Sequence, residues 1–355
     1  MALLEVTDLT VAFDTPDGVV EAVRGLSFDV DAGRTLGIVG ESGSGKSVAT
    51  QTIAGLTRGA HIGGRALFDG EDLLTAGPDR LRAIQGAQIA TIFQDPLSSL
   101  HPYYRVGWQI AEMIREHRRC SRATARARTV ELLDLVGIPQ AEQRVRDYPH
   151  QFSGGMRQRV MIAMALALNP KLLIADEPTT ALDVTVQAQI IELMRRLQQQ
   201  FAIAIVMITH DLGVVASMAD EVLVMYAGRA MEQAPRRELY YRPHHPYTLG
   251  LLGSLPDGGD PAERLRPIPG QPPSLINPPP GCPFHPRCEF VMDRCVSERP
   301  ALRLVAGPAA HRSACWLPLS TLGRDATGSR IGFAASRRSG AAGPIARRYA
   351  TEAQR

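Results

Sequence analysis

Residues Gly40-Glu41-Ser42-Gly43-Ser44-Gly45-Lys46-Ser47 (GESGSGKS) decide the fold of this chain. They match the spacing GxxxxGK[ST] of a phosphate-binding loop, whose glycines let successive backbone N–H groups turn inward onto phosphate oxygens. In such a loop Lys46 reaches the β- and γ-phosphates of a nucleotide, and the Ser47 hydroxyl binds Mg²⁺. The residues predicted to bind the phosphates are Gly40, Ser42, Gly43, Ser44, Gly45, Lys46 and Ser47.

The sequence on either side of the loop has the pattern that a phosphate loop requires. Residues 35–39 (TLGIV) are typical of a buried strand, and a helix is predicted from about Lys46. A chance glycine-rich turn would lack this strand–loop–helix context. Further buried strands are predicted at 172–175 and 203–208. Strands that alternate with helices predict an α/β fold with a mostly parallel core sheet, whose ligands bind at the carboxyl ends of the strands.

Other parts of the chain surround this core. Residues 3–31 alternate apolar and polar positions, which predicts an antiparallel β subdomain. Over about 98–168 the pattern becomes helical, with Ser121 as a predicted N-cap and Gly137 as a left-handed C-terminal cap. We therefore expect a nucleotide-binding domain over residues 1–235, with a helical subdomain inserted into it.

The character of the chain changes after residue 235. Proline becomes frequent and periodicity fades, so residues 236–320 are predicted to form a small, loop-rich C-terminal domain. Residues 321–355 are rich in Arg, Ala, Gly and Ser with almost no large apolar side chains, and we expect a disordered tail. Its arginines could touch anionic lipid, but a solvated tail without a role is the favoured interpretation.

Composition and charge narrow the class of protein. The 355 residues are 45% hydrophobic and 21% charged, which is enough apolar material for a sizeable core. A formal net charge of +3 is too weak to indicate nucleic acid. No apolar run approaches the roughly 20 residues of a spanning helix, and the N-terminus lacks a basic signal-peptide region. We therefore expect a cytoplasmic protein with reduced thiols.

Two adjacent carboxylates follow the predicted strand at 172–175. Asp176 and Glu177 would be costly at the end of a buried strand unless they bind or react. Asp176 is placed to hold Mg²⁺ through water, and Glu177 to polarise the attacking water as a general base. An acidic strand end facing solvent is the alternative, but the phosphate loop upstream favours the catalytic interpretation.

A third motif, at residues 153–158, indicates to which family of phosphate-loop proteins the chain is similar. Ser153-Gly154-Gly155-Met156-Arg157-Gln158 begins a predicted helix, where Ser153 and the backbone amides could grip an anion. With the motifs above, it resembles the LSGGQ signature of ATP-binding-cassette (ABC) ATPases, with Phe152 in the leucine position and Met156 in the glutamine position. The resemblance implies ATP and Mg²⁺ as ligands and a site shared by two subunits, in which the signature of one contacts the ATP bound by the other.

The same resemblance assigns further residues. Gln94 occupies the Q-loop position, which binds Mg²⁺ and faces the membrane subunits, and Asp183 occupies the D-loop. His210 matches the switch histidine that contacts the γ-phosphate, and it is predicted to act in catalysis with Glu177. Phe13 stands where the family places an aromatic ring against adenine, although a phenylalanine in a strand can equally be core.

Three segments resemble the ATPases of oligopeptide, dipeptide and nickel importers, in particular their D-type subunit. The segments are QDPLSSLHP at 94–102, HPYT at 245–248 and PPPGCPFHPRC at 278–288. The resemblance implies peripheral attachment to the cytoplasmic face of the membrane. It also implies partners: a second ATPase subunit (a copy or a relative), two membrane permease subunits and an extracytoplasmic substrate-binding protein. Peptide is the favoured cargo, with nickel or another small solute as the alternative.

Two other classes fit less well. Soluble ABC ATPases of DNA repair or translation carry long coiled coils or two cassettes, and this chain has one cassette and no heptad run. A regulatory module that binds ATP without hydrolysing it would need a changed Glu177 or His210, and both are present.

Four cysteines cluster in the C-terminal domain, at Cys282, Cys288, Cys295 and Cys315. In a proline-rich segment with few large apolar residues, four thiols suggest a metal that staples the fold. Chemistry alone favours zinc, with His285 or His311 as spare ligands. The importer resemblance favours a [4Fe–4S] cluster instead, and a domain without metal is the third possibility.

Overall fold

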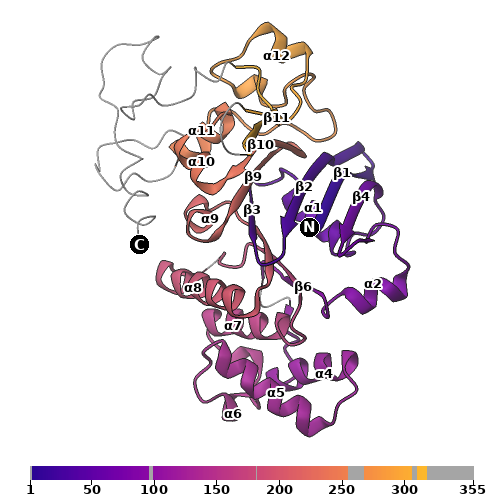
Figure 1. Cartoon of the computed structure of the whole chain (residues 1–355), viewed down its shortest axis with the longest axis vertical. Coiled ribbons are helices and arrows are strands. Elements are labelled where there is room, and N and C mark those ends of the chain that lie inside the picture. The colour runs from indigo at the N-terminus through magenta and orange to yellow at the C-terminus, as the bar shows by residue number, and fades with distance from the viewer. Residues whose placement is uncertain (1, 96–98, 181, 255–267, 306–309, 318–355) are drawn as a thin grey trace.

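The computed structural model describes residues 2–95, 99–180, 182–254, 268–305 and 310–317. Figure 1 shows a core sheet in the middle of the molecule, an antiparallel sheet beside it, a helical part at one end and the C-terminal segment at the other. The predicted tail at 321–355 lies outside the described residues.

The N-terminal strands form an antiparallel sheet, as their alternating pattern predicts. Strand β1 (Ala2–Thr15) pairs with β2 (Gly18–Asp31) on one side and with β4 (His61–Phe68) on the other. The short β5 (Glu71–Asp72) completes the order β2-β1-β4-β5. The alternate apolar side chains, such as Leu4, are buried against the core.

The core sheet has five parallel strands in the order β9-β3-β8-β7-β6. Their bounds are β3 (Thr35–Val39), β6 (Ile89–Ile92), β7 (Leu172–Asp176), β8 (Ala204–Ile208) and β9 (Glu221–Tyr226). The strands predicted at 35–39, 172–175 and 203–208 are thus confirmed. Three antiparallel strands extend the sheet beyond β9: β10 (Arg229–Pro235), β12 (Arg312–Ser313) and β11 (Arg303–Leu304).

Both faces of the parallel strands are buried, which explains their continuous apolar sequences. On β7, Leu172 and Ile174 pack into the core shared with the antiparallel sheet and with α1 (Lys46–Ile53). Leu173 and Ala175 point the other way, into the core shared with the helical part. The core sheet therefore fixes both subdomains relative to its strand ends.

The helical part consists of helices between β6 and β7. Its helices are α4 (Val106–His117), α5 (Arg122–Leu135), α6 (Ala141–Arg144) and α7 (Gly154–Ala165). Ser121 caps α5 by accepting a hydrogen bond from the Thr124 amide, and Gly137 takes a left-handed conformation, so both predicted caps are confirmed. Helix α7 packs against α4, α5 and β6 and against α8 (Val184–Phe201) of the core.

The remaining helices cover the core and build the C-terminal segment. They are α2 (Pro78–Ile84), α9 (Leu212–Met218), α10 (Arg236–Tyr241), α11 (Pro246–Gly253) and α12 (Asp293–Ser297), with 3-10 turns at Pro149–Gln151 and His285–Arg287. No helix in the described ranges is long and apolar enough to cross a membrane.

The C-terminal segment is bonded directly to the core sheet. Strand β12 pairs with β10, and Glu232 of β10 is a buried carboxylate that accepts hydrogen bonds from the His245 amide and from His311 Nε2. The division of the chain at residue 235 remains an interpretation of the sequence, because the sheet continues across it.

Candidate nucleotide-binding and hydrolysis site

The predicted phosphate loop connects β3 to α1 and is pressed against neighbouring backbone. Gly40 and Gly45 have φ angles of 154° and 96°. A Cβ on Gly40 would lie 2.2 Å from the Met225 carbonyl oxygen, and one on Gly45 would lie 2.2 Å from that of Ala22. Only glycine fits at either position, so the loop keeps a bare backbone with which to surround an anion.

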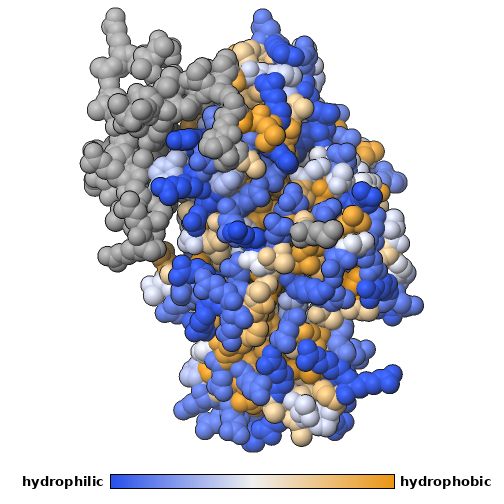
Figure 2. Space-filling model, in the orientation of Figure 1, coloured by the Kyte–Doolittle hydropathy of each residue, from blue (hydrophilic) through white to orange (hydrophobic). Residues whose placement is uncertain are grey.

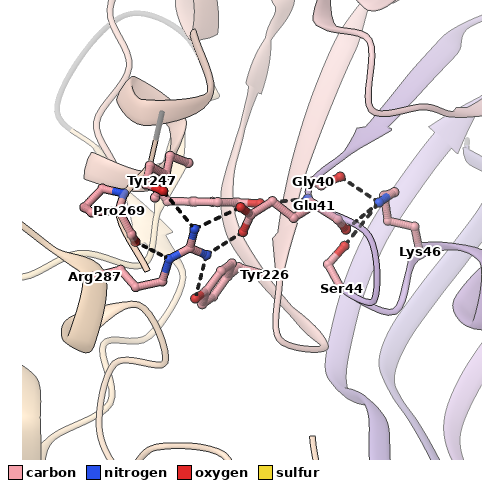
Figure 3. Close-up of polar contacts among 9 residues, drawn as sticks. Gly40, Glu41, Ser44, Lys46, Tyr226, Tyr247, Pro269 and Arg287 are labelled. Carbon is pink, nitrogen blue, oxygen red and sulfur yellow. Dashed lines mark hydrogen bonds and ion pairs between the residues drawn. The ribbon is translucent and has the colours of Figure 1, made fainter. Parts of the chain in front are cut away.

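Lys46 is drawn into the loop that precedes it (Figure 3). Its Nζ donates hydrogen bonds to the carbonyl oxygens of Gly40 (2.7 Å) and Glu41 (2.8 Å) and to Ser44 Oγ (3.3 Å). Burial lowers the pKa of Lys46, and the charges of Glu177 and Asp176 oppose that shift. The loop therefore holds a buried cation among carbonyl groups.

Two oxygen donors meet between the loop and β7. Ser47 Oγ donates a hydrogen bond to Asp176 Oδ1 over 3.0 Å. Burial raises the pKa of Asp176, and the bond from Ser47 partly offsets this. A hydroxyl and a carboxylate at this spacing fit Mg²⁺, which prefers hard oxygen ligands.

The carboxylate of Glu177 is contacted by three side chains of the site. Its Oε2 accepts hydrogen bonds from Gln94 Nε2 (2.8 Å) and Thr180 Oγ1 (2.9 Å), and its Oε1 lies 3.1 Å from His210 Nδ1. Burial acts to raise the pKa of Glu177, but the bonds from His210 and Thr180 outweigh it, so the pKa lies below its usual range. The backbone is also unusual, since φ of Glu177 is 47°, a conformation that is strained for a residue with a side chain.

The strand order explains why these residues meet. Gln94, Glu177 and His210 follow the carboxyl ends of β6, β7 and β8, which are neighbours in one parallel sheet. The phosphate loop follows β3, the next strand along. Four adjacent strands thus deliver a phosphate loop, an amide, a carboxylate and an imidazole to one edge.

The structure places the other predicted residues elsewhere. Ser153 is the N-cap of α7, and Gly154 and Gly155 form its first turn; Figure 1 shows α7 among the helices of the helical part, apart from α1. Asp183 caps α8 by accepting a hydrogen bond from the Val186 amide. The residues 96–98 and 181 of the Q-loop and D-loop motifs lie outside the described residues.

Phe13 lies in β1, half-buried against the core between the antiparallel sheet and α1. This position is compatible with packing in the core and with contact between the Phe13 ring and a nucleotide base. Its contact with adenine stays a prediction, as do the individual roles assigned above.

The prediction of an iron–sulfur cluster at the cysteines is wrong, and zinc gains no support either. In the described ranges, no group of three or more His, Cys, Asp or Glu side chains is arranged to hold a metal ion. Burial raises the pKa of Cys282 to about 11, of Cys288 to about 12 and of Cys315 to about 11. The remaining member, Cys295, is a buried free thiol.

Apolar packing supplies the stability that the sequence argument assigned to a metal. Tyr226 and Tyr247, with ring centroids 4.7 Å apart, both pack against Phe284, which lies between the cysteines in sequence. All three rings are buried in one cluster that also contains Cys282 and Cys295. The C-terminal segment therefore shares a hydrophobic core with residues that precede it.

Sequence reasoning missed several polar residues around the site. Thr180 holds Glu177, and Gln187 of α8 donates to Asp211 Oδ2 (2.8 Å) beside the switch histidine. Tyr247 and Arg287 contact the phosphate loop from the C-terminal segment. The last two stood inside motifs that indicated the importer group, and that membership was the only available signal.

Two protein-family models match this chain. The model described as "ABC transporter" matches residues 23–180, and the model described as "Oligopeptide/dipeptide transporter, C-terminal region" matches residues 231–295.

Curated relatives are similar over nearly their whole length. The chain is 52% identical over 321 residues to "Oligopeptide transport ATP-binding protein OppD" of Salmonella typhimurium, which covers 90% of this chain and 95% of that protein. It is 49% identical over 318 residues to "Dipeptide transport ATP-binding protein DppD" of Bacillus subtilis, which covers 89% and 94%. These names describe ATP-binding proteins of peptide transport.

Solved structures show the same cassette. A dimeric ATP-binding cassette in a post-hydrolysis state bound to ADP and Pi is 26% identical with a TM-score of 0.60, and the match covers 66% of this chain and 99% of that one. The protein cbiO1 from Clostridium perfringens, part of an ABC transporter complex, is 29% identical with a TM-score of 0.58, covering 67% and 90%. The chain therefore belongs to the ABC transporter family, as an ATP-binding and ATP-hydrolysing subunit of the oligopeptide/dipeptide group.

Proposed function

We propose that this chain powers the import of dipeptides or oligopeptides across a membrane. Relatives at about half sequence identity over nine tenths of the chain carry the names of oligopeptide and dipeptide transport proteins, which supports peptide as the cargo class. Nickel or another small solute is the alternative that the same importer group leaves open.

The observation that carries the proposed mechanism is the set of contacts around Glu177. Its carboxylate is ionised at neutral pH and is held on both oxygens, by Gln94 and Thr180 on one and by His210 on the other. A fixed carboxylate beside a phosphate loop can polarise a water molecule for in-line attack on the γ-phosphate of ATP. His210 then steadies the carboxylate and the γ-phosphate.

The phosphate loop and β7 supply the other parts of the reaction. Lys46 gives up the carbonyls of Gly40 and Glu41 and binds the β- and γ-phosphates. Mg²⁺, held by Ser47 and Asp176 with Gln94 nearby, would neutralise charge that develops on the phosphate oxygens.

The signature turn supports a site shared between two chains. Ser153, Gly154 and Gly155 begin α7, so their amides form a helix N-terminus that can bind an anion. Because α7 lies apart from α1, the helix that follows the phosphate loop (Figure 1), this turn can contact ATP held by a second ATPase subunit. ATP binding would close the pair, and hydrolysis at Glu177 would reopen it.

An exposed aromatic patch in the segment that follows Gln94 in the sequence supports docking of the permease. Tyr103 and Trp108 are 83% and 49% exposed, and Tyr104 stacks on Trp108 with ring centroids 4.4 Å apart. Gln109 fixes this turn by donating to the Tyr104 carbonyl oxygen. In Figure 2 hydrophilic side chains predominate on the visible face, with smaller apolar areas among them. Exposed aromatic clusters of this kind mark interaction surfaces.

The test is uptake by a reconstituted transporter. The chain is assembled in vesicles with its permease subunits, the second ATPase and the substrate-binding protein, and uptake of labelled tripeptide, dipeptide and Ni²⁺ is measured with ATP inside. We expect ATP-dependent peptide uptake that Glu177→Gln abolishes. Uptake of Ni²⁺ alone would reject the proposed cargo, and peptide uptake that survives Glu177→Gln would reject the proposed motor.

A further inference from the structure

Arg287 connects the C-terminal segment to the phosphate loop. It lies in the 3-10 turn His285–Arg287, and its side chain is 5% exposed. Nη1 and Nη2 donate to the two carboxylate oxygens of Glu41, at 2.6 and 3.0 Å. Figure 3 shows this two-pronged pair extending from the C-terminal segment to the second residue of the phosphate loop.

Every remaining donor position of the guanidinium faces a fixed acceptor. Nε donates to the Pro269 carbonyl oxygen at 2.8 Å, Nη1 also donates to Tyr226 Oη at 3.2 Å, and Nη2 also donates to the Ile268 carbonyl oxygen at 3.4 Å. The bond to Glu41, the largest influence, raises the pKa of Arg287, so the group stays charged. A planar fork held in this way orients a carboxylate in a manner that a lysine could not reproduce.

A second contact holds the same loop residue from the same side. The Glu41 amide donates to Tyr247 Oη at 2.8 Å, and Tyr247 is buried in α11. Both Tyr247 and Arg287 lie within residues 231–295, the part matched by the oligopeptide/dipeptide C-terminal family model. Glu41 is therefore anchored by its side chain and by its backbone to a segment outside the residues that match the ABC transporter model.

Glu41 also contributes to the position of Lys46. The carbonyl oxygens of Gly40 and Glu41 both accept from Lys46 Nζ, so the orientation of these peptides sets where that ammonium lies. On its other side Gly40 is packed against the Met225 carbonyl, and the loop cannot relax in that direction.

We infer that Arg287 is a positioning residue for ATP binding, acting through Glu41 to hold the phosphate loop in its binding conformation. The inference deepens the proposed function, because it rests on this loop binding ATP. The C-terminal segment then helps to hold the phosphate loop in place. Breaking its contact with Glu41 lowers the affinity for ATP, although Arg287 itself does not contact the phosphates.

The experiment measures the Kd of a fluorescent ATP analogue for the full chain carrying Arg287→Gln, Glu41→Gln, or both. We expect each single variant to raise Kd about tenfold. The double variant should be within about twofold of the singles, because the two side chains act as one unit. Arg287→Lys, which keeps the charge but loses the fork, should fall between Arg287→Gln and the wild type.

The assembled transporter supplies a second readout. Because the loop binds phosphates in the ground state and transition state alike, the KM for ATP should rise about tenfold in Arg287→Gln while kcat changes less than about threefold. The matched control is Arg294→Gln, which removes the arginine of an exposed pair with Glu298 in the same segment and should leave Kd unchanged.

A purely structural role makes a different prediction. Arg287→Gln would then loosen the C-terminal segment, seen as faster proteolysis, while Glu41→Gln, which leaves the bond to Pro269 untouched, would bind ATP normally. Wild-type Kd in Glu41→Gln, or effects that multiply to about a hundredfold in the double variant, would overturn the inference. Failure of the wild-type chain itself to bind ATP would instead contradict the proposed function.

Discussion

At the scale of single residues, the unusual backbone of Glu177 indicates why this site needs a specific side chain. Its φ of 47° costs on the order of 1–3 kcal/mol, and the Glu177 amide is held in place by a bond of 2.8 Å to the Ile208 carbonyl of the neighbouring strand. The strain directs the carboxylate toward Gln94 and His210 rather than along the strand.

Glu177→Gln should therefore separate binding from turnover. The amide keeps the size and one acceptor of the carboxylate but has no useful basicity, so ATP should bind normally while turnover falls about 100-fold or more. Equilibrium binding of nucleotide and steady-state phosphate release measure the two quantities. Glu192→Gln, the same change at an exposed residue of α8, serves as the control. Turnover within a few-fold of wild type would remove Glu177 from the role of base.

His245 should make stability dependent on pH. Burial lowers its pKa to about 3, whereas an unfolded histidine has a pKa near 6.5. The unfolded chain then binds more protons between those values, so stability is full above about pH 6.5 and falls as pH drops below it. At 1.36 kcal/mol per pH unit, the loss from pH 6.5 to 5 is about 2 kcal/mol.

Urea unfolding of the wild type and of His245→Asn at several pH values checks this. Asn does not titrate, and its side-chain oxygen can accept the Tyr247 amide bond that His245 Nδ1 accepts over 3.0 Å. The variant should lose about 2 kcal/mol less than the wild type over the same pH range. Parallel pH profiles would show that His245 does not set the dependence.

At the scale of elements, the signature turn is fixed by its packing on α8. A Cβ added to Gly155 would lie 2.6 Å from Val186 Cγ1, too close for the two helix ends to keep their positions. Gly155→Ala should thus displace the first turn of α7 and lower ATP turnover about tenfold, while ATP binding by the same chain's phosphate loop stays normal.

Removing the clash should restore activity. Val186→Ala deletes the Cγ1 atom that the new methyl group would meet, so Gly155→Ala/Val186→Ala should regain most of the lost turnover. Steady-state phosphate release of the assembled transporter measures it. A double variant that is as slow as Gly155→Ala would mean that the methyl group itself blocks the ATP of the partner, rather than the displaced helix.

The sequence predicted elements better than it predicted contacts between them. Local patterns were enough for β3, β7, β8 and for the Ser121 cap, because neighbouring residues determine them. The pair of Arg287 and Glu41 joins residues 246 positions apart, and no local pattern reports it.

The iron–sulfur prediction was taken from the importer resemblance, and the expectation that the C-terminal segment needs a metal at all failed for a related reason. Counting large apolar residues within the proline-rich segment overlooked Tyr226, which comes from β9 and buries its ring against Phe284. The stability attributed to a metal comes instead from a core shared across the boundary at residue 235.

At the scale of the whole molecule, the aromatic patch predicts how the motor meets the membrane subunits. Trp108→Ser should leave the ATPase activity of the chain without permease unchanged, since Trp108 lies outside the site. It should reduce the permease-stimulated activity about tenfold, because it removes half-exposed apolar surface from the proposed docking area. Leu304→Ser changes an apolar residue in β11 that is 66% exposed, against 49% for Trp108, and is the control. Full stimulation in Trp108→Ser would move the docking surface elsewhere.

The central claim is that two chains complete each ATPase site around Glu177. The most direct test is the ATP turnover per chain, measured over a range of chain concentrations that spans the monomer and the dimer, with Glu177→Gln as the baseline. The account predicts a turnover per chain that rises with concentration and levels off when the dimer is complete. A turnover per chain that stays constant while the protein is monomeric would contradict it.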